Sequence, residues 1–160
     1  MSLFEVSLFL HITAVVVGFG ATFAESIAFP VAMKLDPRHL PYVHALQLAI
    51  NRRLATPALL IVLVTGLYQV DEAGYGFGDA WVSASLLILI VIGGLLGGYF
   101  VPTDRRLLTM VQGEVDAAGG GPVTLSEEYQ RQARVEGMVG ALTGLLLVLA
   151  IFLMVVKPGA

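Results

Sequence analysis

The stretch WVSASLLILIVIGGLLGGYFV, at residues 81–101, contains no charged side chain and no proline. About 20 such residues in a helix cross the hydrocarbon core of a bilayer. Three further stretches, at residues 3–33, 42–70 and 137–156, are also mostly apolar. Backbone groups in lipid must be hydrogen-bonded internally, and long apolar runs without strict alternation favour helices over a barrel. We therefore predict one all-α domain over residues 1–160, a four-helix transmembrane bundle.

The composition supports membrane insertion and excludes several kinds of function. Apolar residues make up 57% of the chain, charged residues 13%, and the mean hydropathy is +0.84. A soluble domain has about 25% charged residues. The chain has no cysteine, which excludes disulfides, thiolate nucleophiles and iron–sulfur ligation. The net charge of −3 and the lack of a basic run argue against nucleic acid as a partner, and leave the lipid bilayer as the expected environment.

The distribution of basic residues predicts the orientation. The loop between the second and third spans holds Asp71, Glu72 and Asp79 and no basic residue. Most Lys and Arg residues lie instead in or beside the first and third loops, which share one side of a four-span protein. They are Lys34, Arg38, Arg52, Arg53, Arg105, Arg106, Arg131 and Arg134. Basic loops stay in the cytoplasm. We expect a multi-pass protein of the cell (cytoplasmic) membrane with both termini outside.

The third loop is expected to be partly helical. Residues 103–116 can continue the third helix into the cytosol, and the run Gly119-Gly120-Gly121-Pro122 breaks it. Thr124, followed by Glu127 three residues later, fits a capping box at the start of the next helix. We predict a cytoplasmic helical hairpin with the glycines at its tip.

Ionisable residues at membrane depth are costly and therefore mark candidate sites. Glu25 lies at the inner end of the first span, at the depth of Arg52 and Arg53 in the second helix. We expect a structural ion pair between Glu25 and one of these arginines, because an unpaired charge is costly there. The second helix also carries a polar stripe that should face the bundle interior. Its polar members are His44, Asn51 and Gln69.

His11, in the outer half of the first span, leaves two interpretations open. Such a histidine either hydrogen-bonds a neighbouring helix or serves as an axial ligand to a heme or a contact to a porphyrin or copper ion. His39 and His44 lie on the cytoplasmic side, so no second histidine shares its depth. A His/Met site with Met154, near the outer end of the fourth span, is compatible with the sequence. We predict no separate metal site.

Small residues mark where helices approach closely. The third span carries two overlapping small-xxx-small pairs. They are formed by Gly93, Gly94, Gly97 and Gly98. This glycine face serves either packing within the chain or the seam of a homo-oligomer.

Three segments resemble known membrane families. LHITAVVVGFG at residues 10–20 and AIFLMVVKP at residues 150–158 resemble an uncharacterised family of four-helix bacterial integral membrane proteins. A more distant resemblance is to the HemJ family of membrane protoporphyrinogen oxidases and to CopD-type copper-resistance proteins. The segment NRRLATPALLIVLVTGLY at residues 51–68 is similar to the corresponding HemJ helix. The HemJ resemblance implies that His11 is a heme ligand and that Trp81 matches the tryptophan that opens the next HemJ span.

The likeness to HemJ ends after Trp81. HemJ proteins carry a lysine there that is implicated in activity, whereas residues 82–85 read VSAS. The resemblance therefore implies heme or porphyrin binding without implying protoporphyrinogen oxidation. We expect a small membrane protein that binds such a cofactor near His11 and is redox-linked. The alternative is a non-catalytic accessory or assembly subunit of a larger membrane complex.

Overall fold

Four long helices make up the structure, a computed structural model that describes residues 1–159. The first helix, Leu3–Ala32, consists of α1 (Leu3–Ala14), a π-helical turn (Val15–Phe19) and α2 (Gly20–Ala32). The second, Pro37–Glu72, consists of a 3₁₀ turn (Pro37–His39), α3 (Leu40–Ile50), a π turn (Asn51–Ala55) and α4 (Thr56–Glu72). The third, Ala80–Ala118, consists of α5 (Ala80–Leu95), a π turn (Leu96–Phe100) and α6 (Val101–Ala118), and the fourth is α7 (Glu127–Val156).

Each of the four helices is long and apolar enough to cross a membrane. The described residues contain no strand. The predicted all-α, four-span architecture is confirmed, and the second, third and fourth helices are longer than the apolar runs that predicted them. As predicted, the third helix continues beyond its apolar run, through residues 103–116 to Ala118, and the fourth begins before its apolar run at 137–156, at Glu127.

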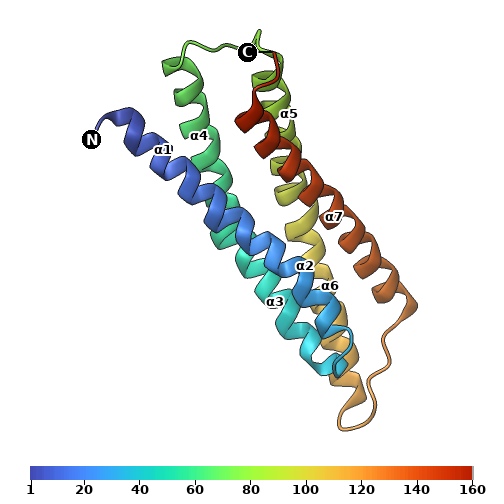
Figure 1. The fold of residues 1–160 in the computed structure, drawn as a ribbon. Coiled ribbons are helices and arrows are strands. Elements are labelled where there is room, and N and C mark those ends of the chain that lie inside the picture. Colours follow the sequence, from blue (N-terminus) through green and yellow to red (C-terminus); the bar gives the residue numbers. More distant parts are fainter. Residues whose placement is uncertain (160) are drawn as a thin grey trace.

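Both termini and the loop at residues 73–79 lie at one end of the bundle (Figure 1). We call this the terminal end. The loops at residues 33–36 and 119–126 lie at the opposite end, which we call the hairpin end (Figure 1). The helical hairpin predicted in the third loop is present, with Gly119 in a positive-φ conformation of 55°. Its second helix is capped by Ser126, whose hydroxyl accepts from the Tyr129 amide, and not by the predicted Thr124.

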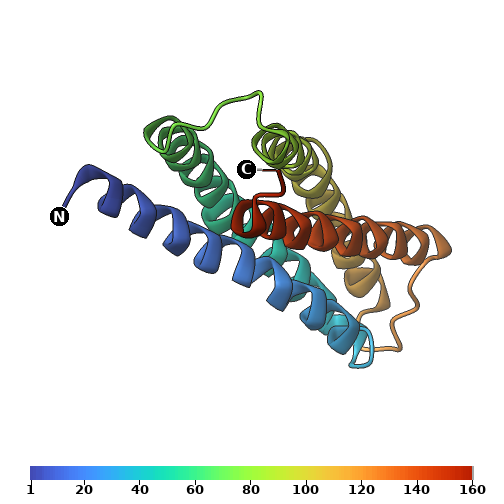
Figure 2. The ribbon, with the colours of Figure 1, turned by 45° about the horizontal axis from the view of Figure 1, so that its top comes forward.

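The helices pair differently at the two ends. Toward the terminal end α1 packs on α4 and α5 packs on α7, whereas α3 packs on α6 toward the hairpin end. Viewed closer to end-on, α7 crosses between the first and third helices (Figure 2). The first two helices approach closely at Gly18, where an added Cβ would collide with the Cβ of Ala58. The absence of a side chain at Gly18 therefore sets the spacing of this pair.

Prolines explain two of the three π turns. Pro57 and Pro102 come two residues after the turns Asn51–Ala55 and Leu96–Phe100, as the second residues of α4 and α6. A proline inside a helix donates no hydrogen bond and clashes with the carbonyl four residues before it. A wider turn relieves that clash, and the Thr56 hydroxyl donates to the Asn51 carbonyl at 2.8 Å. The helices thus continue through their prolines without ending.

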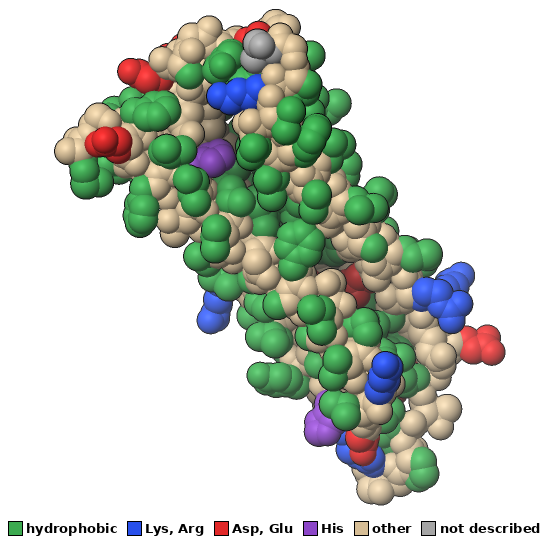
Figure 3. Space-filling view, in the orientation of Figure 1, with side chains coloured by type: hydrophobic (Ala, Val, Ile, Leu, Met, Phe, Trp, Pro, Cys, Tyr) green, Lys and Arg blue, Asp and Glu red, His purple; other side chains and the backbone are tan. Residues whose placement is uncertain are grey.

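Two buried clusters stabilise the bundle and leave a polar zone between them. One lies toward the terminal end and contains Ala14, Phe19, Ala58, Val62, Ile88, Leu89, Ile92, Leu147 and Ala150. The other lies at the hairpin end and contains Ala32, Leu40, Val43, Leu107, Val111, Tyr129 and Ala133. Outside them, hydrophobic side chains cover most of the visible face, and charged side chains lie at the terminal end and over the half toward the hairpin end (Figure 3).

Candidate functional site

The first candidate site is a cavity of about 290 Å³ near the terminal end, which we call the His11 cavity. His11 enters it from α1, and its Nδ1 atom lies 2.9 Å from the Thr65 hydroxyl on α4. The imidazole packs over Gly66, where an added Cβ would lie 3.2 Å from Cε1. Of the two interpretations left open, a hydrogen bond to a neighbouring helix is therefore present in the structure. That bond uses one ring nitrogen and leaves Nε2 for a ligand.

Residues from the other helices complete the His11 cavity. Met154 of α7 and Trp81 of α5 line it together with Lys157, which follows α7. The Lys157 ammonium lies 4.7 Å from the centre of the Tyr75 ring and 5.3 Å from that of Trp81. Trp81 Nε1 and Ser85 Oγ are buried without a hydrogen-bond partner. The cavity thus combines aromatic walls with a cation and two unused polar groups.

The second candidate site is a cavity of about 430 Å³ between the two buried clusters, which we call the acidic cavity. Three acidic residues line it, each from a different helix: Glu25 from α2, Asp104 from α6 and Glu136 from α7. The second helix contributes Gln47 and Asn51 to the same wall. All four helices therefore supply polar groups to one region of an otherwise apolar bundle.

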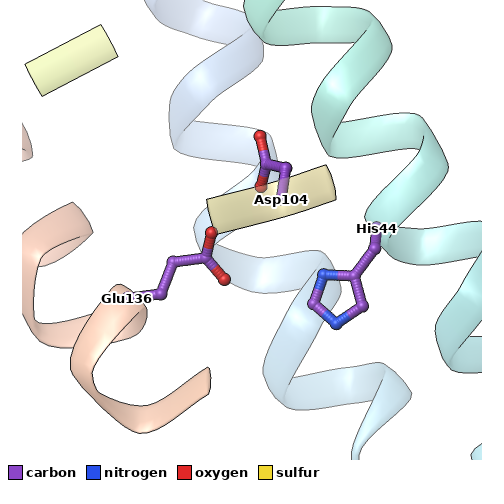
Figure 4. Close-up of side chains that lie close together, drawn as sticks. All are labelled: His44, Asp104 and Glu136. Carbon is purple, nitrogen blue, oxygen red and sulfur yellow. The ribbon is translucent and has the colours of Figure 1, made fainter. Parts of the chain in front are cut away.

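The acidic cavity borders His44, and two hydrogen bonds position its polar groups. Asn51 Nδ2 donates to Asp104 Oδ2 at 2.9 Å, and His44 Nε2 lies 2.8 Å from the Tyr129 hydroxyl. Figure 4 shows the side chains of His44, Asp104 and Glu136 turned toward a common space. One potential ligand atom of each lies within 4.8 Å of the other two. These three residues have the chemistry and the spacing of a metal-ligand set.

Several polar atoms around this space have no hydrogen-bond partner. They are Glu25 Oε1, His44 Nδ1, Gln47 Oε1, Asp104 Oδ1 and Glu136 Oε1. Native interiors hold few such atoms, so five of them around one cavity call for an explanation such as a bound ion, ordered water or a functional role. Three carboxyl groups cannot all be ionised in an apolar cavity unless a cation compensates them. The site therefore requires protons, a cation, or both.

The predicted ion pair between Glu25 and Arg52 or Arg53 is absent from the structure. The salt bridges of residues 1–159 are Arg38–Asp36 and Arg106–Glu128. The side chains of Arg52 and Arg53 are exposed, while the preceding Asn51 is buried. A helix turns by about 100° per residue, so the positions after Asn51 point away from the bundle. Glu25 instead faces the acidic cavity.

The polar stripe of the second helix divides between the two cavities. Asn51 lines the acidic cavity and the buried His44 lies beside it, next to Asp104 and Glu136. Gln69 instead lines the His11 cavity and donates to Ser7 Oγ at 3.3 Å. The rise of 1.5 Å per residue separates Asn51 and Gln69 by about 27 Å. One stripe therefore serves two depths of the bundle.

Asp104 and Glu136 were not among the residues predicted from the sequence. Both stand near arginines, beyond the ends of the apolar runs, and were assigned to the third loop. Their spacing carries a signal that identifies them. Asp104 continues the buried face of Leu107 and Val111, at helical intervals of three and seven residues. Glu136 lies seven residues after the fully buried Tyr129, and so continues the buried face of its own helix in the same way.

The glycines of the third helix have different surroundings. An added Cβ at Gly93 would lie 3.0 Å from Leu59 Cδ2, so this glycine serves packing within the chain. At Gly94, Gly97 and Gly98 an added Cβ would meet nothing within 4 Å. These three glycines are not required by contacts with the described residues.

Comparison with known proteins places the chain in a family without identifying its activity. A family model described as predicted integral membrane protein (DUF2269) matches residues 5–158. No curated protein and no solved structure matches the chain. The comparisons support the resemblance to a family of integral membrane proteins. They give no support to the resemblance to HemJ or CopD-type proteins, which stays a prediction.

Proposed function

The chain belongs to a family of predicted integral membrane proteins, DUF2269, and from this premise we propose that it binds a heme or porphyrin in the His11 cavity and has a redox-linked role. The observation that supports the proposal is the meeting of His11 and Met154 in one cavity, although they come from the first and last helices. A histidine–methionine pair is an established axial ligand set for heme iron.

The surroundings of His11 suit a ligand of this class. A ligand histidine commonly donates its second ring N–H to a fixed partner, and Thr65 stands 2.9 Å from Nδ1. Gly66 lets the imidazole pack closely against α4, because an added Cβ there would lie 3.2 Å from His11 Cε1. Trp81 offers an aromatic surface, and Lys157 offers a cation for a carboxylate of the ligand. The protein residues would bind and orient the group, and a bound heme would supply one-electron chemistry.

The cavity volume limits how the ligand is held. Small-molecule sites have volumes of about 300–1,000 Å³, and the His11 cavity, at about 290 Å³, lies at the lower end. The cavity would therefore enclose only part of a macrocycle. We expect binding in which His11 contributes a large share of the affinity.

The test is a titration of the purified full chain, in detergent, with hemin and with metal-free protoporphyrin. We expect a Soret band that shifts on binding hemin. His11→Ala should abolish the shift, and Met154→Leu, which preserves volume, should alter the spectrum without abolishing binding. His39→Ala is the matched control because its side chain is exposed. An unchanged hemin spectrum in His11→Ala would end the proposal for this residue.

The alternative function, an accessory or assembly subunit, has support from a different feature. Gly94, Gly97 and Gly98 form an open face on the third helix, and small residues allow close helix association in lipid. This face suits a second copy of the chain or a helix of a membrane complex. Gly97→Leu should then dissociate the assembly, detected by crosslinking in membranes, while leaving the fold of the single chain intact.

A further inference from the structure

We propose that His44, Asp104 and Glu136 bind one divalent first-row transition cation, of the class of Mn²⁺, Fe²⁺ or Zn²⁺, inside the bundle. The proposal concerns the acidic cavity and is independent of any ligand at His11. The three residues come from α3, α6 and α7, and one potential ligand atom of each lies within 4.8 Å of the other two. Figure 4 shows the three side chains converging.

The free atoms of the three residues point to a missing partner. His44 Nδ1, Asp104 Oδ1 and Glu136 Oε1 are each buried without a hydrogen bond. The side chains are themselves at least nine-tenths buried, with exposed fractions of 0%, 1% and 7%. Water and lipid headgroups therefore do not satisfy these atoms at the surface. A cation at the centre would satisfy all three at once.

The other atoms of two of these side chains are already engaged in orienting them. His44 Nε2 lies 2.8 Å from the Tyr129 hydroxyl, which fixes the imidazole with Nδ1 toward the carboxylates. Asn51 Nδ2 donates to Asp104 Oδ2 and leaves Oδ1 free. Ligands of metals are commonly held by such outer contacts. Tyr129 and Asn51 are therefore positioning residues for the site.

Charge balance favours a divalent ion. A neutral imidazole and two carboxylates carry a charge of −2, which one divalent cation neutralises. The nearby basic side chains do not perform this role, since Arg52 and Arg53 are exposed and the two salt bridges of the described chain lie elsewhere. Glu25, whose Oε1 is also buried without a partner in the same cavity, is available as a further oxygen ligand or as a proton carrier.

The donor types narrow the choice of metal. An imidazole nitrogen suits Zn²⁺, Fe²⁺ and their neighbours, whereas Mg²⁺ and Ca²⁺ prefer oxygen ligands alone. The absence of cysteine removes the thiolates that select Cu⁺ and iron–sulfur clusters. One nitrogen with two or three carboxylates is therefore a site for Mn²⁺, Fe²⁺ or Zn²⁺.

The experiment measures metal directly on the purified full chain. The protein is stripped with a chelator, equilibrated with ZnCl₂ or MnCl₂, desalted and analysed for bound metal, with affinity taken from competition with a chromogenic chelator. CoCl₂ serves as an optical probe of the ligand set. We expect one equivalent of Zn²⁺ or Mn²⁺ per chain, no comparable retention of Mg²⁺, and a rise in melting temperature with added Zn²⁺.

Matched variants identify the ligands. His44→Gln, Asp104→Asn and Glu136→Gln should each weaken binding more than Asn51→Ala or Tyr129→Phe, for which about a 10–100-fold loss is typical of positioning residues. His39→Gln and Glu127→Gln are controls, because both side chains are exposed. His11→Ala should retain the metal, which separates this site from the proposed function.

Two outcomes would overturn the proposal. The first is a wild-type chain that retains less than a tenth of an equivalent of each metal. This outcome is measured on the wild-type protein and does not depend on whether any variant folds. The second is metal retention that is unchanged in folded His44→Gln and Asp104→Asn, with folding checked by size exclusion and circular dichroism. In either case the carboxyl groups are compensated by protons shared among themselves.

Discussion

The Nε2 atom of His44 lies 2.8 Å from the hydroxyl oxygen of Tyr129, and both side chains are fully buried. The rings meet edge to face with their centroids 5.8 Å apart. The two residues are 85 positions apart in the chain, so this contact joins the second helix to the fourth. The His44–Tyr129 contact lies between the apolar cluster of the hairpin end and the acidic cavity. It therefore affects both the stability of that cluster and the geometry of that cavity.

Tyr129→Phe should lower the stability of the bundle in the metal-stripped protein. The change removes the hydroxyl and leaves a buried histidine nitrogen without a partner, which costs about 1–3 kcal/mol. We expect a lower melting temperature in detergent. Tyr42→Phe is the matched control because Tyr42 is exposed and the chemical change is the same. Equal melting temperatures for both variants would show that the hydrogen bond contributes nothing to stability.

Gly18→Ala should destabilise the protein while Gly20→Ala does not. Both changes add one methyl group to the same helix, but at Gly18 that group would collide with Ala58, and at Gly20 it meets nothing within 4 Å. Overpacking of this kind costs about 1–3 kcal/mol. Thermal unfolding of the two variants measures the difference.

A compensating change tests the same contact from the other side. Removing the Ala58 methyl group should recover part of the loss, so Gly18→Ala with Ala58→Gly should be more stable than the sum of the two single changes predicts. If the stability losses of the two single changes simply add, residues 18 and 58 are not in contact, and the two helices approach closely at other residues.

Glu25→Gln in the metal-stripped protein should leave stability unchanged or raise it. Glu25 faces Asp104 and Glu136 and forms no ion pair with Arg52 or Arg53. A neutral amide replaces a carboxyl group that, without a cation, must either take up a proton or repel its neighbours in the acidic cavity. Arg52→Gln, at an exposed position, should change the free energy of unfolding by less than about 0.5 kcal/mol.

A double-mutant cycle separates this expectation from a hidden ion pair. The effects of Glu25→Gln and Arg52→Gln should add within about 0.5 kcal/mol, since independent sites are additive. The same holds with Arg53→Gln in place of Arg52→Gln. A coupling free energy of several kcal/mol between Glu25 and either arginine would show that the ion pair predicted from the sequence does form.

Single cysteines at Gly76 and Gly120 should report the orientation, because the native chain has no cysteine. A side chain at either position meets nothing within 4 Å. The bias of basic residues predicts that an impermeant thiol reagent added to intact cells labels Gly76→Cys and leaves Gly120→Cys unlabelled until the membrane is opened. The reverse labelling pattern would invert the predicted topology.

The sequence determined the number and approximate position of the helices, because the free energy of inserting a segment into the membrane depends on the summed hydrophobicity of its own residues. The run at residues 81–101 is long enough to span a bilayer whatever its neighbours do. The polar continuation of the third helix to Ala118 and the early start of α7 at Glu127 were only partly predictable. The apolar runs end before these segments. The helices continue because Val111 and Tyr129 are buried as members of the hairpin-end cluster.

The meeting of His44, Asp104 and Glu136 was decided by the tertiary structure alone. Their convergence depends on the rotation and crossing of three helices, which the close approach at Gly18 and the π turns before Pro57 and Pro102 help to set. No segment of the chain contains that information by itself. The sequence by itself determined which parts of the chain enter the membrane, because transfer from water to lipid is a property of each segment. Only packing between segments decided which polar groups face one another, because that depends on relative positions of residues far apart in the chain.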